Sequence, residues 1–118
     1  MLAKRLMTIL PDLSLEESLE TTKVHSISGA LKNGASLVMS ANLHRPPMAF
    51  LRELVRRKVR DLRVIGVVGG DLNIDFLVGA GAVKVVDTCS VTMGEFARTG
   101  PNFSRYVLSG RGRALDNT

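Results

Sequence analysis

Residues 62–70 read LRVIGVVGG, an apolar run that leads directly into a pair of glycines. A short run rich in β-branched residues is typical of a strand buried in a parallel sheet. Gly69 and Gly70 are typical of the tight turn that ends such a strand. We therefore predict a buried strand over residues 62–68.

Patterns of the same kind precede and follow this strand. Further strands are expected at residues 35–41, 83–87 and 113–116, and helices at residues 46–60, 72–80 and 102–109. Strands that alternate with helices are typical of a parallel sheet with right-handed crossovers. The predicted fold is therefore α/β, an open and mostly parallel sheet with flanking helices.

The first expected helix, which begins at Pro46-Pro47, is amphipathic. Its apolar face carries Leu51, Leu54, Val55 and Val59, and its opposite face carries Arg52, Glu53, Arg56, Arg57 and Arg60. We interpret the charged face as solvated, with Glu53 paired to Arg57 one turn later. The alternative interpretation is a basic patch for nucleic acid.

Composition restricts the possible functions. With 118 residues the chain is one domain or less, and its net charge of +5 and pI of about 10.0 suit an acidic ligand such as a nucleotide phosphate. The same charge suits weak nucleic-acid binding. Aromatic residues make up only 4% of the sequence and tryptophan is absent, so stacking platforms for single-stranded nucleic acid are poorly supplied.

The single cysteine, Cys89, excludes an internal disulfide and a cysteine-rich zinc site, and no metal is expected. It lies in a β-branched run, residues 85–91, and we predict a buried thiol. No apolar run reaches the roughly 18 residues that a membrane span needs. The N-terminus lacks the features of a signal peptide, so a cytoplasmic location is expected.

Residues 1–31 have a different character and are predicted to form a short helical segment. Residues 14–17, Ser-Leu-Glu-Glu, match a capping box, which predicts a helix from about Leu15 to Lys23. Residues 1–6 are also compatible with a helix that ends near Pro11. His25 is expected to be an exposed residue near a helix end, with a general base as the alternative.

Four motifs of this segment, MLAKRL (1–6), TILP (8–11), LEE (15–17) and TKVHSISG (22–29), resemble magnesium-chelatase-like AAA+ ATPases. In that family the segment follows the phosphate-binding loop, Gly-x-x-x-x-Gly-Lys-Ser/Thr, whose amides and lysine hold the phosphates. No such motif occurs in this sequence, and ATP hydrolysis is not expected. The resemblance implies a fused AAA+ fragment with a seam near residues 31–34.

The remainder, about residues 32–118, resembles the α subunit of family I coenzyme A (CoA) transferases, of the glutaconate CoA-transferase type. The resemblance rests on LHRPPMA (43–49), REL (52–54), RDL (60–62), LVGAGAV (77–83) and GEF (94–96). It implies transfer of CoA between an acyl-CoA and a carboxylic acid, in a heteromer with a β subunit. The chain stops part-way through the family's sheet, so a fragment that is inactive alone is expected.

Ligands of parallel sheets bind at the carboxyl ends of the strands. Gly69 and Gly70 lie there and could let a backbone approach an anion at the next helix start, with an ordinary turn as the alternative. The resemblance places the acyl-CoA site beside the loop after the first strand, and implies CoA contacts for Asn42, His44 and Arg45. The family usually carries a glycine pair where this sequence has Met39-Ser40.

Glu95, in the GEF motif, is the one catalytic candidate, expected at the end of the third strand as a general base or nucleophile. The resemblance implies that the nucleophilic glutamate of the transferase comes from the β subunit, and that ring-opening hydrolase relatives use an α-subunit carboxylate. Three alternatives to the transferase remain: an inactive remnant, an acyl-CoA ring-opening hydrolase and a basic nucleic-acid-binding module.

Overall fold

A four-stranded parallel sheet forms the centre of the computed structural model, which describes residues 14–41 and 45–116. The strands are β1 (Ser36–Ser40), β2 (Leu62–Val67), β3 (Val83–Asp87) and β4 (Arg113–Leu115). They lie in the order β1-β2-β3-β4, and every neighbouring pair is parallel. The predicted α/β fold with an open parallel sheet is confirmed.

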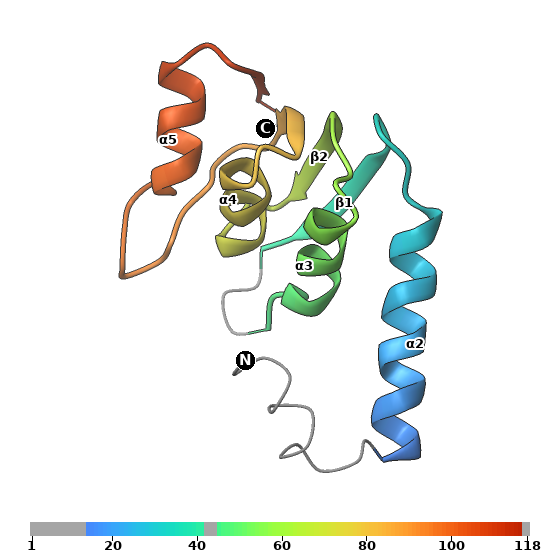
Figure 1. The fold of residues 1–118 in the computed structure, drawn as a ribbon. Coiled ribbons are helices and arrows are strands. Elements are labelled where there is room, and N and C mark those ends of the chain that lie inside the picture. The colour runs from blue at the N-terminus through green and yellow to red at the C-terminus, as the bar shows by residue number, and fades with distance from the viewer. Residues whose placement is uncertain (1–13, 42–44, 117–118) are drawn as a thin grey trace, which may run out of the picture.

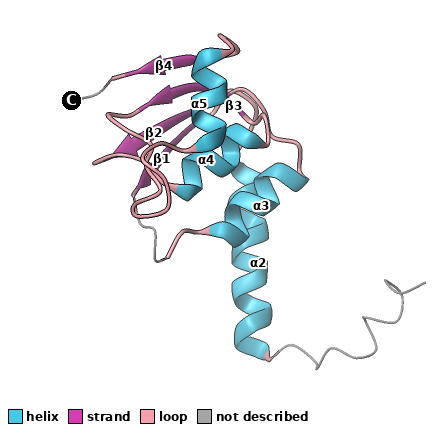
Figure 2. Cartoon of the chain, turned by 90° about the vertical axis from the view of Figure 1, so that its left-hand side faces the viewer, coloured by secondary structure: helices cyan, strands magenta, loops and turns pink. Residues whose placement is uncertain are grey.

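The crossovers are the helices α3 (Met48–Arg56), α4 (Leu72–Gly79) and α5 (Pro101–Leu108). The chain moves to the next strand in the same direction each time. Right-handed crossovers of this kind place their helices on one face of a sheet. Figures 1 and 2 show α3, α4 and α5 on the same side, and within residues 14–41 and 45–116 no helix lies on the other face of the sheet.

The hydrophobic core lies between the sheet and this helix layer. Its fully buried side chains include Leu51, Leu54, Leu62, Val64, Ile74, Leu77 and Val86. Leu51 and Leu54 come from the apolar face predicted for α3. Val59, predicted for the same face, is 5% exposed but follows the end of the helix.

The opposite face of the sheet, which no helix of the described residues covers, carries apolar side chains. Val38 on β1 is 60% exposed and Val67 on β2 is 47% exposed. Arg63 and Asp87 form an ion pair on this face, with 2.5 Å between Nη2 and Oδ2.

Helix α2 (Leu15–Ala30) extends seven residues beyond the Lys23 end that the sequence predicted. The capping box is confirmed: the Ser14 hydroxyl accepts from the Glu17 amide at 3.2 Å, and the Glu17 carboxylate accepts from the Ser14 amide at 2.8 Å. The added residues contact α3, which explains why a local pattern missed them. The expected helix at residues 1–6 and its end near Pro11 lie outside the described residues.

Two expectations about side chains were wrong. Cys89 is exposed, not buried, because β3 ends at Asp87 and the chain turns away before the cysteine. Glu53, expected on a solvated face, is only 6% exposed, because α2 covers that side of α3. Its predicted pairing with Arg57 is confirmed, with 2.9 Å between Nε and Oε1.

No helix in the described part of the chain is both long and apolar enough to span a bilayer. Within residues 14–41 and 45–116, no three His, Cys, Asp or Glu side chains gather in a group that could hold a metal ion.

Candidate functional site

The carboxyl edge of the sheet brings together the turns after β2 and β3. The Gly70 amide donates to the Ser90 carbonyl at 2.7 Å, and the Thr92 amide donates to the Gly70 carbonyl at 2.9 Å. Gly70 also forms an isolated parallel bridge with Val91. Hydrogen bonds in both directions hold these two turns as one rigid ledge.

The two glycines are required by close packing at this ledge. Gly69 has φ of +99°, and a methyl group on it would lie 3.1 Å from the Ser90 Oγ. A methyl group on Gly70 would lie 2.5 Å from Cδ1 of Ile74. The preceding residue, Val68, has φ of +60° and is 91% exposed. A β-branched residue in this region is strained, and such strain is common at functional sites.

The amides at the start of α4 are already occupied by side chains of the protein. Asp71 Oδ1 accepts from the Asn73 amide at 3.0 Å, and Asn73 Oδ1 accepts from the Ile74 amide at 2.7 Å. The Gly70 amide is bonded to Ser90, as above. An anion at this helix start would have to displace these hydrogen bonds. The turn at Gly69 and Gly70 therefore shapes the carboxyl edge of the sheet but has no free amide for an anion among those described above.

Asn73 links the ledge to β1, and the sequence analysis did not single it out. Its side-chain Nδ2 donates to the Ser40 carbonyl at 3.0 Å, and the residue is 1% exposed. The available signal was the Asp71-x-Asn73 spacing at a helix start. The link fixes the end of β1 against the start of α4.

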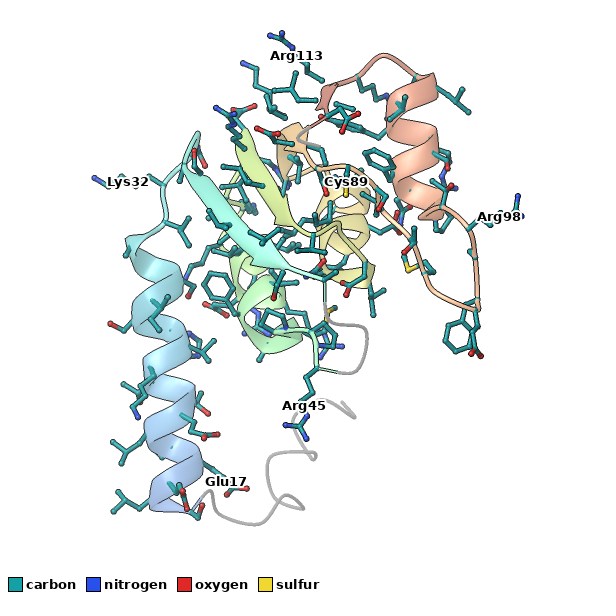
Figure 3. All side chains as sticks on the ribbon, turned by 180° about the vertical axis from the view of Figure 1, so that it is seen from behind. Glu17, Lys32, Arg45, Cys89, Arg98 and Arg113 are labelled. Atoms are coloured by element: carbon teal, nitrogen blue, oxygen red, sulfur yellow. The ribbon has the colours of Figure 1, made fainter. Side chains whose placement is uncertain are left out.

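A hollow of about 260 Å³ lies at the end of β1, beside the start of α3. Its walls are Leu37, Val38, Met39, Ser40, Pro47, Phe50 and Asn73, with Arg45 among them. Figure 3 shows the Arg45 side chain extending outward from the loop that follows β1. The hollow therefore combines an apolar wall with one cation. Asn42 and His44, predicted for the same site, lie outside the described residues.

Glu95 does not lie at the end of β3, as the sequence predicted. It lies eight residues after Asp87, in an exposed turn closed by a hydrogen bond from the Phe96 amide to the Met93 carbonyl at 3.1 Å. The neighbouring Phe96 is 93% exposed. The β3 strand was predicted correctly, but the position of Glu95 was wrong because the chain after β3 first forms the ledge and only then the turn.

A second polar cluster lies between α2 and α3. The Glu53 carboxylate contacts His25 Nδ1 at 3.0 Å, Arg56 Nη1 at 3.0 Å and Arg57 Nε at 2.9 Å. Burial pushes the pKa of Glu53 upward, but the bonds from Arg57 and His25 outweigh it and lower the pKa overall. This carboxylate is therefore held ionised as a structural anchor between the two helices.

Another hollow, about 1070 Å³, lies beside α5 and the beginnings of β2 and β3. Lys84, Arg105, Arg111 and Asp61 line it, and the Tyr106 hydroxyl there donates to the Lys84 carbonyl at 2.6 Å. Ligand sites of parallel sheets lie at the other end of the strands. We therefore assign the candidate site to the smaller hollow.

Comparison with known proteins gives a family model that matches the N-terminal part of the chain and solved structures that match most of it. Residues 1–50 match the family model of magnesium chelatase, subunit ChlI. This match continues past the expected seam at residues 31–34, through β1 and into α3. No curated protein matches the chain.

The solved structures that resemble this chain include a CoA-transferase and a decarboxylase. Glutaconate coenzyme A-transferase from Acidaminococcus fermentans matches with a TM-score of 0.71 and 21% identity, over 80% of this chain and 30% of that chain. A variant of the decarboxylase AibA/AibB matches with a TM-score of 0.68 and 24% identity, over 80% of this chain and 37% of that one. The chain thus has a CoA-transferase-like fold and spans about a third of the solved chains.

Proposed function

We propose that this chain is a CoA-transferase α-subunit-like protein that binds acyl-CoA at the carboxyl end of β1. With a β subunit it would transfer CoA between an acyl-CoA and a carboxylic acid. The observation that carries the proposal is the hollow at the end of β1, which is lined by Arg45 and lies in a CoA-transferase-like sheet. A guanidinium there suits a phosphate or carboxylate of the substrate.

The proposed division of labour follows from the positions of the side chains. Arg45, with Asn42 and His44, would hold the anionic part of the substrate, and the apolar wall would take its carbon chain. Gly69 and Gly70, which have no side chains, would let the ligand approach the backbone of the neighbouring turn closely. CoA is the substrate in this proposal, and the proposed reaction uses no metal.

The reacting carboxylate would come from the β subunit. It would attack the thioester carbonyl carbon, and the CoA thiolate would leave. Glu95 is exposed on a turn after β3. Glu95 would be the nucleophile or base only if the protein acts as a ring-opening acyl-CoA hydrolase.

The chain is much shorter than the solved structures it resembles, and this affects the activity that we expect of it alone. Because the chain covers 30% and 37% of those two chains, the remaining parts of a working site would have to come from elsewhere. We therefore expect CoA binding without turnover by the isolated chain. Turnover should appear only when a β subunit is added.

Isothermal titration with CoA tests the binding step. We expect a dissociation constant in the micromolar to millimolar range, weakened at least tenfold by Arg45→Ala. Arg98→Ala is the matched control, because Arg98 is an exposed arginine on a different loop. The absence of binding at several millimolar CoA would favour the inactive remnant instead.

The arginines at and after the C-terminal end of α3 give little support to the nucleic-acid alternative. Arg56 and Arg57 are bonded to Glu53, and Arg60 Nη1 donates to the Ala80 carbonyl at 3.1 Å. These cations stabilise the fold and are only partly available to phosphates. Binding to DNA with a steep dependence on salt concentration would contradict this view.

A further inference from the structure

The hollow of about 1070 Å³ beside α5 carries an excess of positive charge. Its charged lining residues are Lys84, Arg105, Arg111 and Asp61, and all four are exposed. Within residues 14–41 and 45–116, none of the four belongs to a salt bridge. Three cations therefore share this hollow with a single carboxylate.

Apolar side chains form another part of the same wall. Val78 and Val83 are 7% and 9% exposed, whereas Leu108, the last residue of α5, is 87% exposed. Pockets that combine apolar walls with a few polar groups are typical of sites for small organic molecules. The lining therefore suits a ligand that has an organic part as well as negative charge.

A chain of hydrogen bonds that begins at a buried carboxyl group holds Arg105 in place. Asp75, which is 2% exposed, accepts from Asn102 Nδ2 and from the Phe103 amide, both at 2.8 Å. Because the amino group of Asn102 faces Asp75, its Oδ1 faces the other way, and it accepts from Arg105 Nη2 at 2.7 Å. The guanidinium keeps further N–H donors, for which the described part of the chain provides no partner.

Glycine at position 79 makes room for the amide in this chain. A methyl group on Gly79 would lie 2.8 Å from Cγ of Asn102. Gly79 and Asn102 both line the hollow. The first glycine of the LVGAGAV run (77–83) therefore admits the side chain that orients Arg105.

We propose that the hollow beside α5 binds the phosphate group of a small organic phosphate monoester. Arg105, Lys84 and Arg111 would contact the phosphate oxygens, and the apolar wall would contact the organic part. A phosphate monoester carries close to two negative charges at pH 7, which matches the excess of three cations over one carboxylate. Because Arg105 is already held, binding costs less side-chain entropy than it would with a loose arginine.

A structural explanation of the same cations competes with this proposal. Helices α4 and α5 pack side by side and both end at the hollow, and cations stabilise the C-terminal ends of helices (Figure 1). This explains Arg105, which lies in the last turn of α5. It does not explain Lys84, which lies on β3, or the hydrogen bonds that lead from Asp75 to Arg105.

Titration of the ¹⁵N-labelled chain with phenyl phosphate, followed by NMR, tests the site. We expect saturable shifts of the Gly79 and Gly81 amides, with a dissociation constant in the micromolar to millimolar range. Phenyl sulfate has nearly the same shape but one negative charge, and it should bind at least fivefold more weakly. No saturable shift at several millimolar phenyl phosphate, or equal binding of the two ligands, would overturn the proposal.

Variants of exposed arginines locate the binding. Arg105→Ala and Arg111→Ala should each weaken phenyl phosphate binding at least tenfold. Arg98→Ala, on another loop, is the matched control and should leave the binding unchanged. Arg45→Ala should also leave it unchanged, because Arg45 lines the hollow proposed for CoA. Weakening by Arg45→Ala or Arg98→Ala to the same extent as by Arg105→Ala would overturn the second site.

A thermal melt separates the proposal from the structural explanation. If the cations only stabilise helix ends, Arg105→Ala lowers the melting temperature and leaves phenyl phosphate binding intact, and the proposal is wrong. The role of Asn102 is tested by a double-mutant cycle. Asn102→Ala should weaken binding in the wild-type background and have no effect in the Arg105→Ala background. An equal effect in both backgrounds would show that Asn102 does not act through Arg105.

Discussion

His25 Nδ1 lies 3.0 Å from Oε1 of Glu53, although 28 residues separate them in the sequence. Arg57 completes the junction, because its Nη2 donates to the His25 carbonyl at 3.1 Å and its Nε donates to Glu53 at 2.9 Å. The buried Ser28 hydroxyl also donates to the His25 carbonyl, at 3.0 Å. These contacts therefore hold α2 against α3.

Replacing the shared carboxylate should loosen this junction. We expect Glu53→Gln to lower the midpoint of urea unfolding, because Arg57 and His25 lose the charge that both contact. Proteolysis should also cut within α2 sooner in the variant. Glu20→Gln, an exposed change on α2, is the control and should leave both measurements unchanged. If Glu53→Gln resists urea and protease as well as the wild type does, the junction does not contribute to the stability of the protein.

The pH dependence of stability follows from the same carboxylate. The pKa of Glu53 is lowered from its ordinary value of 4.5, so the unfolded chain takes up a proton at this residue more readily than the folded one. The stabilisation is therefore present above about pH 4.5 and is lost as the pH falls through the folded-state pKa. Urea melts between pH 6 and pH 3 should show a smaller loss of stability for Glu53→Gln than for the wild type.

Asn73 should contribute to stability through its link to β1. Asn73→Ala removes a buried side chain with three hydrogen-bonded neighbours and should cost about 1–3 kcal/mol. Asn73→Asp separates the effects, because it keeps the acceptor for the Ile74 amide and loses the donor to Ser40. Chemical denaturation measures both variants. A neutral Asn73→Asp would mean that the Ser40 bond is dispensable.

The strain at Val68 predicts a stabilising substitution. Asparagine tolerates the left-handed region far better than valine, and the Val68 side chain is 91% exposed, so little packing is lost. We expect Val68→Asn to raise the free energy of unfolding by about 1 kcal/mol. Val67→Asn, one residue earlier in the strand, should instead be destabilising. Thermal melts of the two variants would show opposite shifts.

Elements with a strong local pattern could be predicted closely from the sequence. The β3 bounds, residues 83–87, agree with the structure, and the helix expected at residues 72–80 differs from α4 by one residue. Both segments have apolar patterns of their own, and Gly79 and Gly81 mark the turn between them. The order of strands and helices followed from them.

Features that depend on distant residues could not be predicted in this way. The second half of α2 is polar and is held by contacts with α3, such as the one from His25 to Glu53. A helical wheel places Glu53 opposite Leu51, and only the fold reveals that α2 covers that side. The Asn73 link is also invisible, because Ser40 lies 33 residues earlier.

The exposed Cys89 gives the molecule a built-in reporter. It is the single thiol in the sequence, and a methyl group on Gly69 would lie 3.9 Å from its Sγ. A maleimide dye would therefore attach at one known position, on the ledge beside the candidate site, without engineering. Its fluorescence could follow ligand arrival in real time, and the same thiol requires that the protein be stored with a reducing agent.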